Sequence, residues 1–202
     1  MAKEIGAHIS DGNRKVGNIP NWSLTPGRTC SAEACRTCFI DGCYACKSYR
    51  QYKNVRAAWD ENSELAEKHL DALERYLNFY FSRMTAPRFF RIHVAGDFVS
   101  RAYAEMWARV AEKAPGTRFL AFTKQWENVR GVSFPENFSL VLSGWPGTEI
   151  PADLKEKYRT ATCVETPEEI PDGGFHCPGS CENCGACWEL AKRGIDVYFV
   201  KH

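Results

Sequence analysis

The sequence lacks a long apolar run, a secretory leader and an excess of charge of one sign. No stretch approaches the roughly 20 consecutive apolar residues that a membrane-spanning helix needs, and the polar N-terminal residues contain no apolar leader core. Lys and Arg together number 26 against 25 Asp and Glu, so the composition does not indicate the basic groove that is typical of nucleic-acid binding. These absences predict a cytoplasmic protein with no membrane partner, and they leave nucleic acid as the weakest of the partner hypotheses.

Cysteine is also absent from residues 57–162, although the chain contains 10 cysteines among its 202 residues. A chain of this size with 44% hydrophobic residues can bury a core without disulfide cross-links. In a reducing cytosol, grouped cysteines indicate metal binding more often than disulfides. All but Cys163 fall in two loops, 30–46 and 177–187. The predicted metal ligands are Cys30, Cys35, Cys38, Cys43, Cys46, Cys177, Cys181, Cys184 and Cys187.

The spacing within the two groups favours iron–sulfur clusters over zinc. Two thiolates separated by two residues can face one ion or one cluster, and this spacing recurs in both groups. Structural zinc sites usually separate two such pairs by a dozen or more residues, whereas Cys177-x3-Cys181-x2-Cys184-x2-Cys187 places its thiolates in one loop, as bacterial ferredoxins do. We therefore predict two four-iron–four-sulfur clusters, one per loop, with zinc as the alternative metal. Cys163 is either a distant ligand of the N-terminal group or a buried apolar residue.

The remaining sequence predicts a single α/β domain over residues 1–202, with a mainly parallel sheet of alternating strands and helices. The pattern does not decide whether this sheet stays open or closes into a partial βα barrel. Asn62 or Ser63 is the predicted cap of a long helix that reaches Met84, and Ser100 caps a second one. The predicted strands are 88–95, 117–123, 138–143, 159–164 and 195–200, and the other predicted helical segments are 100–114, 125–130, 152–158 and 188–192.

Polar side chains follow the predicted strands, where parallel α/β folds place their active sites. His93, Gly96 and Asp97 follow the first strand of the alternation, and Lys124 follows the second. His93, Asp97 and Lys124 are therefore the candidate catalytic residues. Asp97 has an equally simple interpretation as a group that stabilises the start of a helix, and Lys124 as a solvated charge.

Several short segments together resemble one known family. They are the run from Arg91 to Ser100 with Tyr103 and Trp107 behind it, Phe122-Thr123-Lys124, Cys43-Tyr44-Ala45 and Cys187-Trp188. On these residues the chain is similar to the phage-encoded gene product 88 family from Cys30 onward. The resemblance implies a phage origin and work in the cytoplasm of a bacterial host cell, and it implies no particular activity.

A looser resemblance is to the radical S-adenosylmethionine (SAM) enzymes, which are partial βα barrels with a Cys-x3-Cys-x2-Cys loop after the first strand. Cys30-x4-Cys35-x2-Cys38 stands in the corresponding place, and Gly96 with Asp97 would replace the family's Gly-Gly-Glu segment, which holds the cofactor's amino group. The first cysteine interval is one residue longer than in that family, and Asp replaces Glu. The run with the family's spacing lies near the C-terminus, where a fourth cysteine would fill the iron position that binds SAM.

Two classes of function follow from these observations. In the first, the chain is an iron–sulfur protein that acts as a redox module, served by an electron donor, or as a radical SAM-like enzyme. In the second, it is a non-catalytic phage protein that binds a host protein, with structural zinc or structural clusters, and Trp22, Trp126 and Trp145 supply its interface. The basic stretch 47–56 keeps nucleic acid as a third hypothesis, although such runs are usually a solvated helix face.

Overall fold

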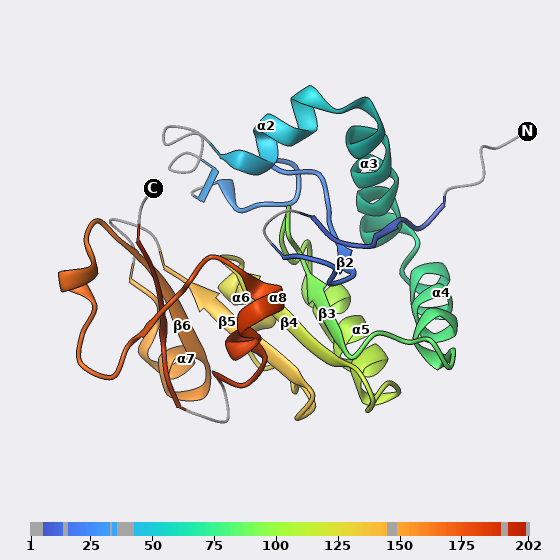
Figure 1. Ribbon diagram of the computed structural model, residues 1–202. Coiled ribbons are helices and arrows are strands. Elements are labelled where there is room, and N and C mark those ends of the chain that lie inside the picture. The colour runs from blue at the N-terminus through green and yellow to red at the C-terminus, as the bar shows by residue number, and fades with distance from the viewer. Residues whose placement is uncertain are drawn as a thin grey trace, which may run out of the picture.

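The core of the fold is a mixed, mostly parallel sheet, seen at the centre of Figure 1. The computed structural model describes residues 6–13, 16–32, 34–35, 43–144, 149–190 and 194–200. The eight strands within these ranges lie in the order β1-β2-β3-β4-β5-β6-β8-β7, and every pairing except β1 with β2 is parallel. In order along the chain they are β1 (Ile9–Ser10), β2 (Asn21–Trp22), β3 (Phe89–Ile92), β4 (Arg118–Thr123), β5 (Phe138–Ser143), β6 (Arg159–Val164), β7 (Phe175–His176) and β8 (Val197–Val200).

Helices cover one face of this sheet, on the far side in Figure 1. Alternate side chains of each strand point to that face, since successive residues of a strand face opposite sides. Phe90, Ile92 and Phe119 pack there against apolar residues of the helices. The helices that pack there are α3 (Lys53–Lys68), α4 (Leu70–Ser82), α5 (Arg101–Glu112), α6 (Trp126–Val129) and α7 (Ala152–Lys157). Helix α2 (Tyr44–Gln51) packs against α3 above the sheet in Figure 1, and the 3-10 turn Pro167–Glu169 is exposed.

The opposite face of the sheet is covered by the C-terminal cysteine segment. This segment contains α8 (Cys181–Cys184) and a 3-10 turn over Ala186–Trp188, and Figure 1 shows α8 in front of the strands. Cys187, Trp188 and Leu190 form a second apolar cluster with strand residues that include Leu120 and Val141. The indole Nε1 of Trp188 donates to the carbonyl of Phe90 at 3.4 Å, which fixes the segment on the sheet.

All five predicted strands are confirmed. The strands predicted at 138–143 and 159–164 have the predicted bounds, and β3, β4 and β8 lie inside their predicted ranges. The Oγ of Ser100 accepts a hydrogen bond from the backbone N–H of Tyr103 at 3.2 Å, as expected for the residue that caps α5. The pairings among the described residues leave β1 and β7 as the two edges, so the sheet is mixed and open there, and a closed barrel is not seen.

The prediction of one helix from Asn62 to Met84 is wrong. The chain forms α3 from Lys53 and α4 from Leu70, with His69 between them. Asn62 and Ser63 cap neither helix, because they are buried inside α3 and bind the N-terminal segment. The Nδ2 of Asn62 donates to the carbonyls of His8 and Ser23, both at 2.9 Å, and a polar side chain used in this way can lie in mid-helix.

Two further expectations need correction. Trp22, predicted as an interface residue, is fully buried, whereas Trp126 is half-buried and Trp145 lies outside the described residues. The helix predicted at 188–192 starts too early, because Trp188 ends a 3-10 turn; Leu190 is helical, and residues 191–193 lie outside the described part. None of the helices in the described ranges has both the length and the apolar character needed to cross a bilayer.

Candidate functional site

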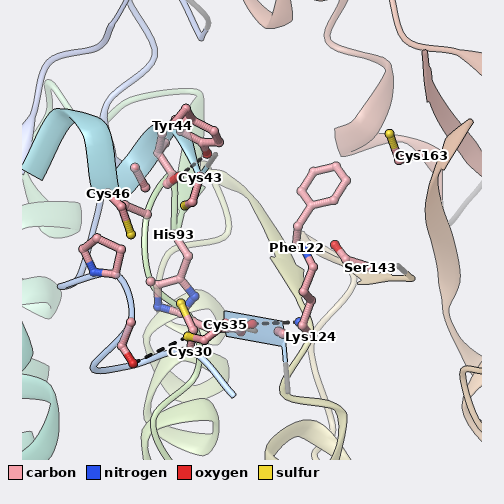
Figure 2. A pocket seen from close by; sticks show the side chains of 18 of the residues that line it. Cys30, Cys35, Cys43, Tyr44, Cys46, His93, Phe122, Lys124, Ser143 and Cys163 are labelled. Carbon is pink, nitrogen blue, oxygen red and sulfur yellow. Dashed lines mark hydrogen bonds between the residues drawn. The ribbon is translucent and has the colours of Figure 1, made fainter. Parts of the chain in front are cut away.

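A cavity of about 350 Å³ lies at the carboxyl ends of the parallel strands. Four thiols of the N-terminal cysteine group line one side of it, and Cys163 at the end of β6 lies on the far wall, as Figure 2 shows. The other lining residues include Arg91, His93, Gly96, Asp97, Phe122, Lys124, Ser143 and Phe199. The four described N-terminal cysteines and all three predicted catalytic residues therefore meet in one place.

The thiols in this cavity are shielded from water to different degrees. Burial raises the pKa of the Cys30 thiol to about 12, with smaller contributions from Asp97 and neighbouring thiols. Cys46 is buried, whereas Cys35 and Cys43 are half-buried. A buried thiol with a raised pKa is largely protonated near pH 7, and a positive metal centre that binds it favours the thiolate. Cys38 lies outside the described residues.

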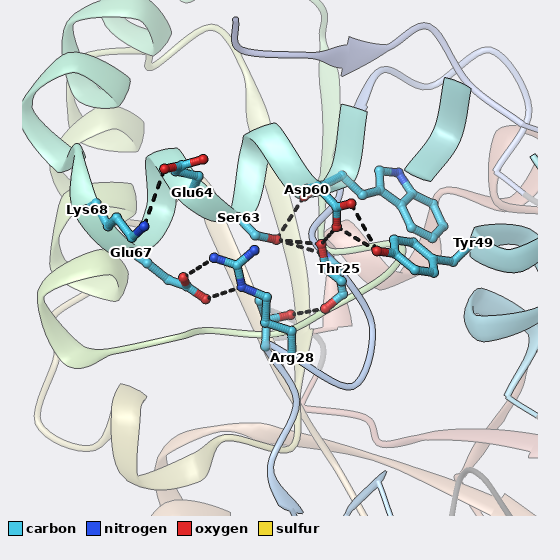
Figure 3. Close-up of polar contacts among 10 residues, drawn as sticks. Thr25, Arg28, Tyr49, Asp60, Ser63, Glu64, Glu67 and Lys68 are labelled. Carbon is cyan, nitrogen blue, oxygen red and sulfur yellow. Dashed lines mark hydrogen bonds and ion pairs between the residues drawn. The ribbon is translucent and has the colours of Figure 1, made fainter. Parts of the chain in front are cut away.

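A polar network holds the loop between β2 and the cysteine group against two helices (Figure 3). The backbone N–H of Thr25 donates to the Oγ of Ser63 on α3 at 2.8 Å, and the hydroxyl of Thr25 donates to Asp60 at 2.7 Å. Asp60 also accepts from the hydroxyl of Tyr49 on α2, at 2.8 Å. These bonds connect the segments before and after the cysteine group to α3.

Gly96 and Asp97 form the turn after β3. Gly96 has a φ of +77°, and a Cβ there would lie 2.6 Å from the Cβ of Leu24, so the position requires glycine. The Asp97 carboxylate accepts hydrogen bonds from the hydroxyl of Thr123 at 2.5 Å and from the backbone N–H groups of Phe98 and Lys124 at 2.8 and 2.7 Å. Burial raises the pKa of Asp97 while these bonds oppose the rise.

The observed role of Asp97 is thus to tie the end of β3 to the end of β4. Both of its oxygens already accept protein hydrogen bonds. Its predicted catalytic and cofactor-binding roles, and the cofactor-binding role of Gly96, stay predictions, as do the catalytic roles of His93 and Lys124.

His93 lies in a strained and enclosed position. Its φ is +59°, a left-handed backbone conformation that residues other than glycine rarely adopt, and the residue is 4% exposed. Nε2 lies 3.0 Å from the hydroxyl of Tyr103, and the ring meets that of Phe98 edge to face at 4.7 Å. Burial, helped by the charge of Arg91, lowers the pKa of His93 to about 3, so the imidazole is neutral near pH 7.

The lowered pKa predicts a loss of stability in acid. The unfolded chain takes up a proton at this histidine below its ordinary pKa of 6.5, whereas the folded chain takes it up only near 3. Between these values the unfolded state binds more protons, so His93 should lower the free energy of unfolding by about 1.4 kcal/mol per pH unit as the pH falls. Urea unfolding of the native chain and of His93→Gln, compared between about pH 6.5 and 4.5, measures this slope as a difference. A difference that does not change with pH would contradict it.

Arg91 is a site residue that the sequence analysis missed. Its guanidinium carbon lies 4.2 Å from the centre of the Phe122 ring, and both residues line the cavity. Burial lowers its pKa, while Tyr44 and the thiols of Cys181, Cys187 and Cys177 act in the opposite direction. Arg91 therefore lies between the cavity and the C-terminal cysteines. A charged residue inside the apolar run of β3, Phe-Phe-Arg-Ile, was the signal that could have indicated it.

The C-terminal cysteines form a separate group beside the sheet. Cys177 follows β7, Cys181 and Cys184 begin and end α8, and Cys187 lies in the following turn. All four line one narrow hollow together with Trp188. Burial raises the pKa of Cys187 to about 12, and the three other thiols add to the rise. The backbone carbonyl of Cys187 accepts a hydrogen bond from the hydroxyl of Ser139 at 2.8 Å, which fixes this part of the loop on β5.

The two cysteine groups line separate hollows. In the described part of the chain, which leaves out Cys38, no three His, Cys, Asp or Glu side chains gather closely enough to hold one metal ion. Cys163 is exposed, so its interpretation as a buried apolar residue is wrong. The metal-ligand assignments remain predictions.

The fold and the site together define a class of protein, a parallel α/β domain with a thiol-lined cavity at its strand ends. The family model described as gene product 88 matches residues 3–190, so the chain belongs to the gene product 88 family. The gene 88 protein of Mycobacterium phage L5 is 30% identical over 126 residues, which are 58% of this chain and 53% of the relative. The gene 88 protein of Mycobacterium phage D29 is 29% identical over 126 residues, 58% of this chain and 52% of the relative.

The chain thus spans about half the length of the curated relatives that it matches. No solved structure matches it. The comparisons bear out the resemblance to the phage family and give no support to a relation with radical SAM enzymes.

Proposed function

We propose that this protein binds two four-iron–four-sulfur clusters and that the N-terminal cluster takes part in chemistry on a molecule in the cavity. One observation carries the proposal. Cys30, Cys35, Cys43 and Cys46 line the same cavity as His93 and Lys124, at the carboxyl ends of parallel strands. That edge is where parallel α/β folds place their reactive groups. A cluster held by these thiols, with Cys38 as a fifth available ligand, would face the cavity directly.

The C-terminal cysteines would hold the second cluster. Four thiolates are the usual complete ligand set of a four-iron cluster, and Cys177, Cys181, Cys184 and Cys187 provide that number around one hollow. A cluster also needs a less compact set of thiols than one zinc ion does, because its irons lie between the ligands. Full ligation suits electron transfer, so this cluster would supply or accept electrons, with a separate protein as electron donor.

An N-terminal cluster held by only three of the cavity thiols would have one open iron position, and SAM is the co-substrate that this position would accept. The arrangement that favours this finer proposal is the order of the cysteine group after β2 and the Gly96-Asp97 turn after β3, on adjacent parallel strands. Adding SAM to the reduced protein should then change the electron paramagnetic resonance signal of one cluster. An unchanged signal would exclude SAM binding at the cluster, and the proposal would then be a redox module without SAM.

The alternative is a non-catalytic protein that binds a host component and holds zinc as a structural metal. The exposed aromatic residues Tyr44, Tyr52 and Phe79 favour it, since such side chains are common in interfaces. The basic residues Lys47, Arg50, Lys53 and Arg56 are exposed next to the two tyrosines, as expected of a solvated helix face.

The decisive experiment is the iron, sulfide and zinc content of protein purified without oxygen, together with its visible spectrum. We expect about eight irons and about eight sulfides per chain, with broad absorption at about 400 nm. About four irons would limit the proposal to one cluster. Zinc without sulfide would overturn it and favour the binding protein.

A further inference from the structure

Two buried hydrogen-bond donors at the end of β3 have no partner in the part of the chain that the structure describes. They are the Nε of Arg91 and the Nδ1 of His93. Both side chains line the cysteine cavity, Arg91 beside Phe122 and His93 beside Tyr103. Buried polar atoms in folded proteins almost always have a partner, so two such atoms at one cavity indicate that a ligand supplies it.

The hydrogen bond at Nε2 of His93 decides which of the two ring nitrogens carries the hydrogen. The indole Nε1 of Trp22, which can only donate, donates to the hydroxyl of Tyr103 at 2.9 Å. We assign the proton of the Tyr103 hydroxyl to the hydrogen bond with Nε2 of His93, 3.0 Å away, because a hydroxyl that accepts from Trp22 still has its own hydrogen to donate. Nε2 is then the acceptor, and the imidazole carries its hydrogen on Nδ1. His93 therefore presents an N–H group that requires an acceptor.

The charges around the cavity select an anion. Arg91 and Lys124 both line it. The one carboxylate there, Asp97, is occupied by Thr123 and by the backbone N–H of Lys124. Donors therefore exceed free acceptors among the described lining residues. The Phe122 and Phe199 rings, 5.9 Å apart, provide an apolar wall beside the donors.

We propose that the cavity binds an organic anion, whose carboxylate or phosphate group accepts hydrogen bonds from Arg91 and His93 and whose apolar body packs on Phe122 and Phe199. An arginine fork matches either oxyanion. This inference names the substrate class of the site proposed above and in that sense rests on the proposed function. Its test does not depend on iron, so either proposal can fail while the other stands.

The probes are benzoate, phenyl phosphate and benzamide, titrated into the full chain by calorimetry with the metal content measured beforehand. Benzamide has nearly the shape of benzoate and carries no charge, so it isolates the contribution of the oxyanion. We expect one of the two anions to bind at least about tenfold more tightly than benzamide, since charge-assisted hydrogen bonds are the stronger ones. Tighter benzoate identifies a carboxylate ligand, and tighter phenyl phosphate identifies a phosphoryl ligand. Anions that bind no better than benzamide overturn the proposal.

Variants assign the anion to the two donors. Arg91→Met should remove the preference for the anion and leave benzamide binding unchanged, whereas Arg91→Lys should restore part of it. His93→Gln places its amide near the position of Nε2, keeps the contact with Tyr103 and lacks a donor at Nδ1, so it should weaken anion binding about tenfold. Arg88→Met, at an exposed arginine just before β3, is the matched control and should change nothing.

Two results would contradict this assignment. The first is an Arg91→Met protein that contains less iron and keeps its preference for the anion, because Arg91 would then support metal binding by the C-terminal cysteines. Unchanged anion binding in a folded His93→Gln protein would remove His93 from the site.

Discussion

Replacing Cys181 and Cys184 by serine is expected to remove about four of about eight irons from the protein, with the matching sulfide. These two cysteines begin and end α8 in the hollow that all four C-terminal cysteines line. A serine hydroxyl is a far poorer ligand for iron than a thiolate, so the C-terminal cluster should not assemble. Both side chains are half-buried, so the substitution should not open the core. Iron and sulfide analysis of anaerobically purified protein measures the effect.

The matching change in the N-terminal group is Cys35→Ser with Cys43→Ser. We expect it to remove the other half of the iron, and the two double variants should have additive effects, because the two groups occupy separate hollows. Cys163→Ser is the control. This cysteine is exposed and lies on the opposite wall of the cavity from the other thiols in Figure 2, so the iron content should stay at its full value. If either double variant lost all the iron, or none, two independent clusters would be ruled out.

Replacing Trp107 by alanine is expected to lower the free energy of unfolding by about 3–5 kcal/mol, the range for large aromatic residues in cores. Trp107 is fully buried on α5 and lies at the centre of the aromatic cluster between helices and sheet. Its ring centre lies 6.4 Å from those of Trp22 and Phe119, and 6.0 Å from that of Phe90. Truncation therefore removes contacts to β2, β3 and β4 at once and leaves a cavity that the rigid sheet cannot fill. A loss of this size is a large part of the stability of a typical domain.

Urea unfolding followed by far-ultraviolet circular dichroism gives this value. Phe79→Ala is the matched control, because this aromatic residue lies on α4 with 69% of its surface exposed. Its removal should change the free energy of unfolding by less than about 0.5 kcal/mol. Equal losses in the two variants would show that the aromatic cluster does not dominate the core.

The sequence by itself determined the parallel α/β class and most of the strands. Short apolar runs such as 138–143, bounded by turn residues, favour strands covered on both faces, and helices then connect parallel neighbours. The Ser100 cap was equally accessible, because a cap depends on residues within one turn. The grouping of the cysteines and the position of His93, Asp97 and Lys124 after strands also followed from order along the chain.

Where a feature depends on residues distant in sequence, only the tertiary structure decided it. Asn62 and Ser63 were predicted as caps because both residue types favour helix starts, yet contacts with residues 8, 23 and 25 place them inside α3. Trp22 was expected at a surface, and burial under Trp107 placed it in the core. The division of the cysteines between two hollows, and the position of Arg91 between them, come from strand pairing and from the return of the C-terminal segment across the sheet. Local propensity acts over a few residues, whereas burial and hydrogen-bond partners are set by packing between segments that are far apart in the sequence. The elements could therefore be predicted from the sequence, and the site was decided by packing.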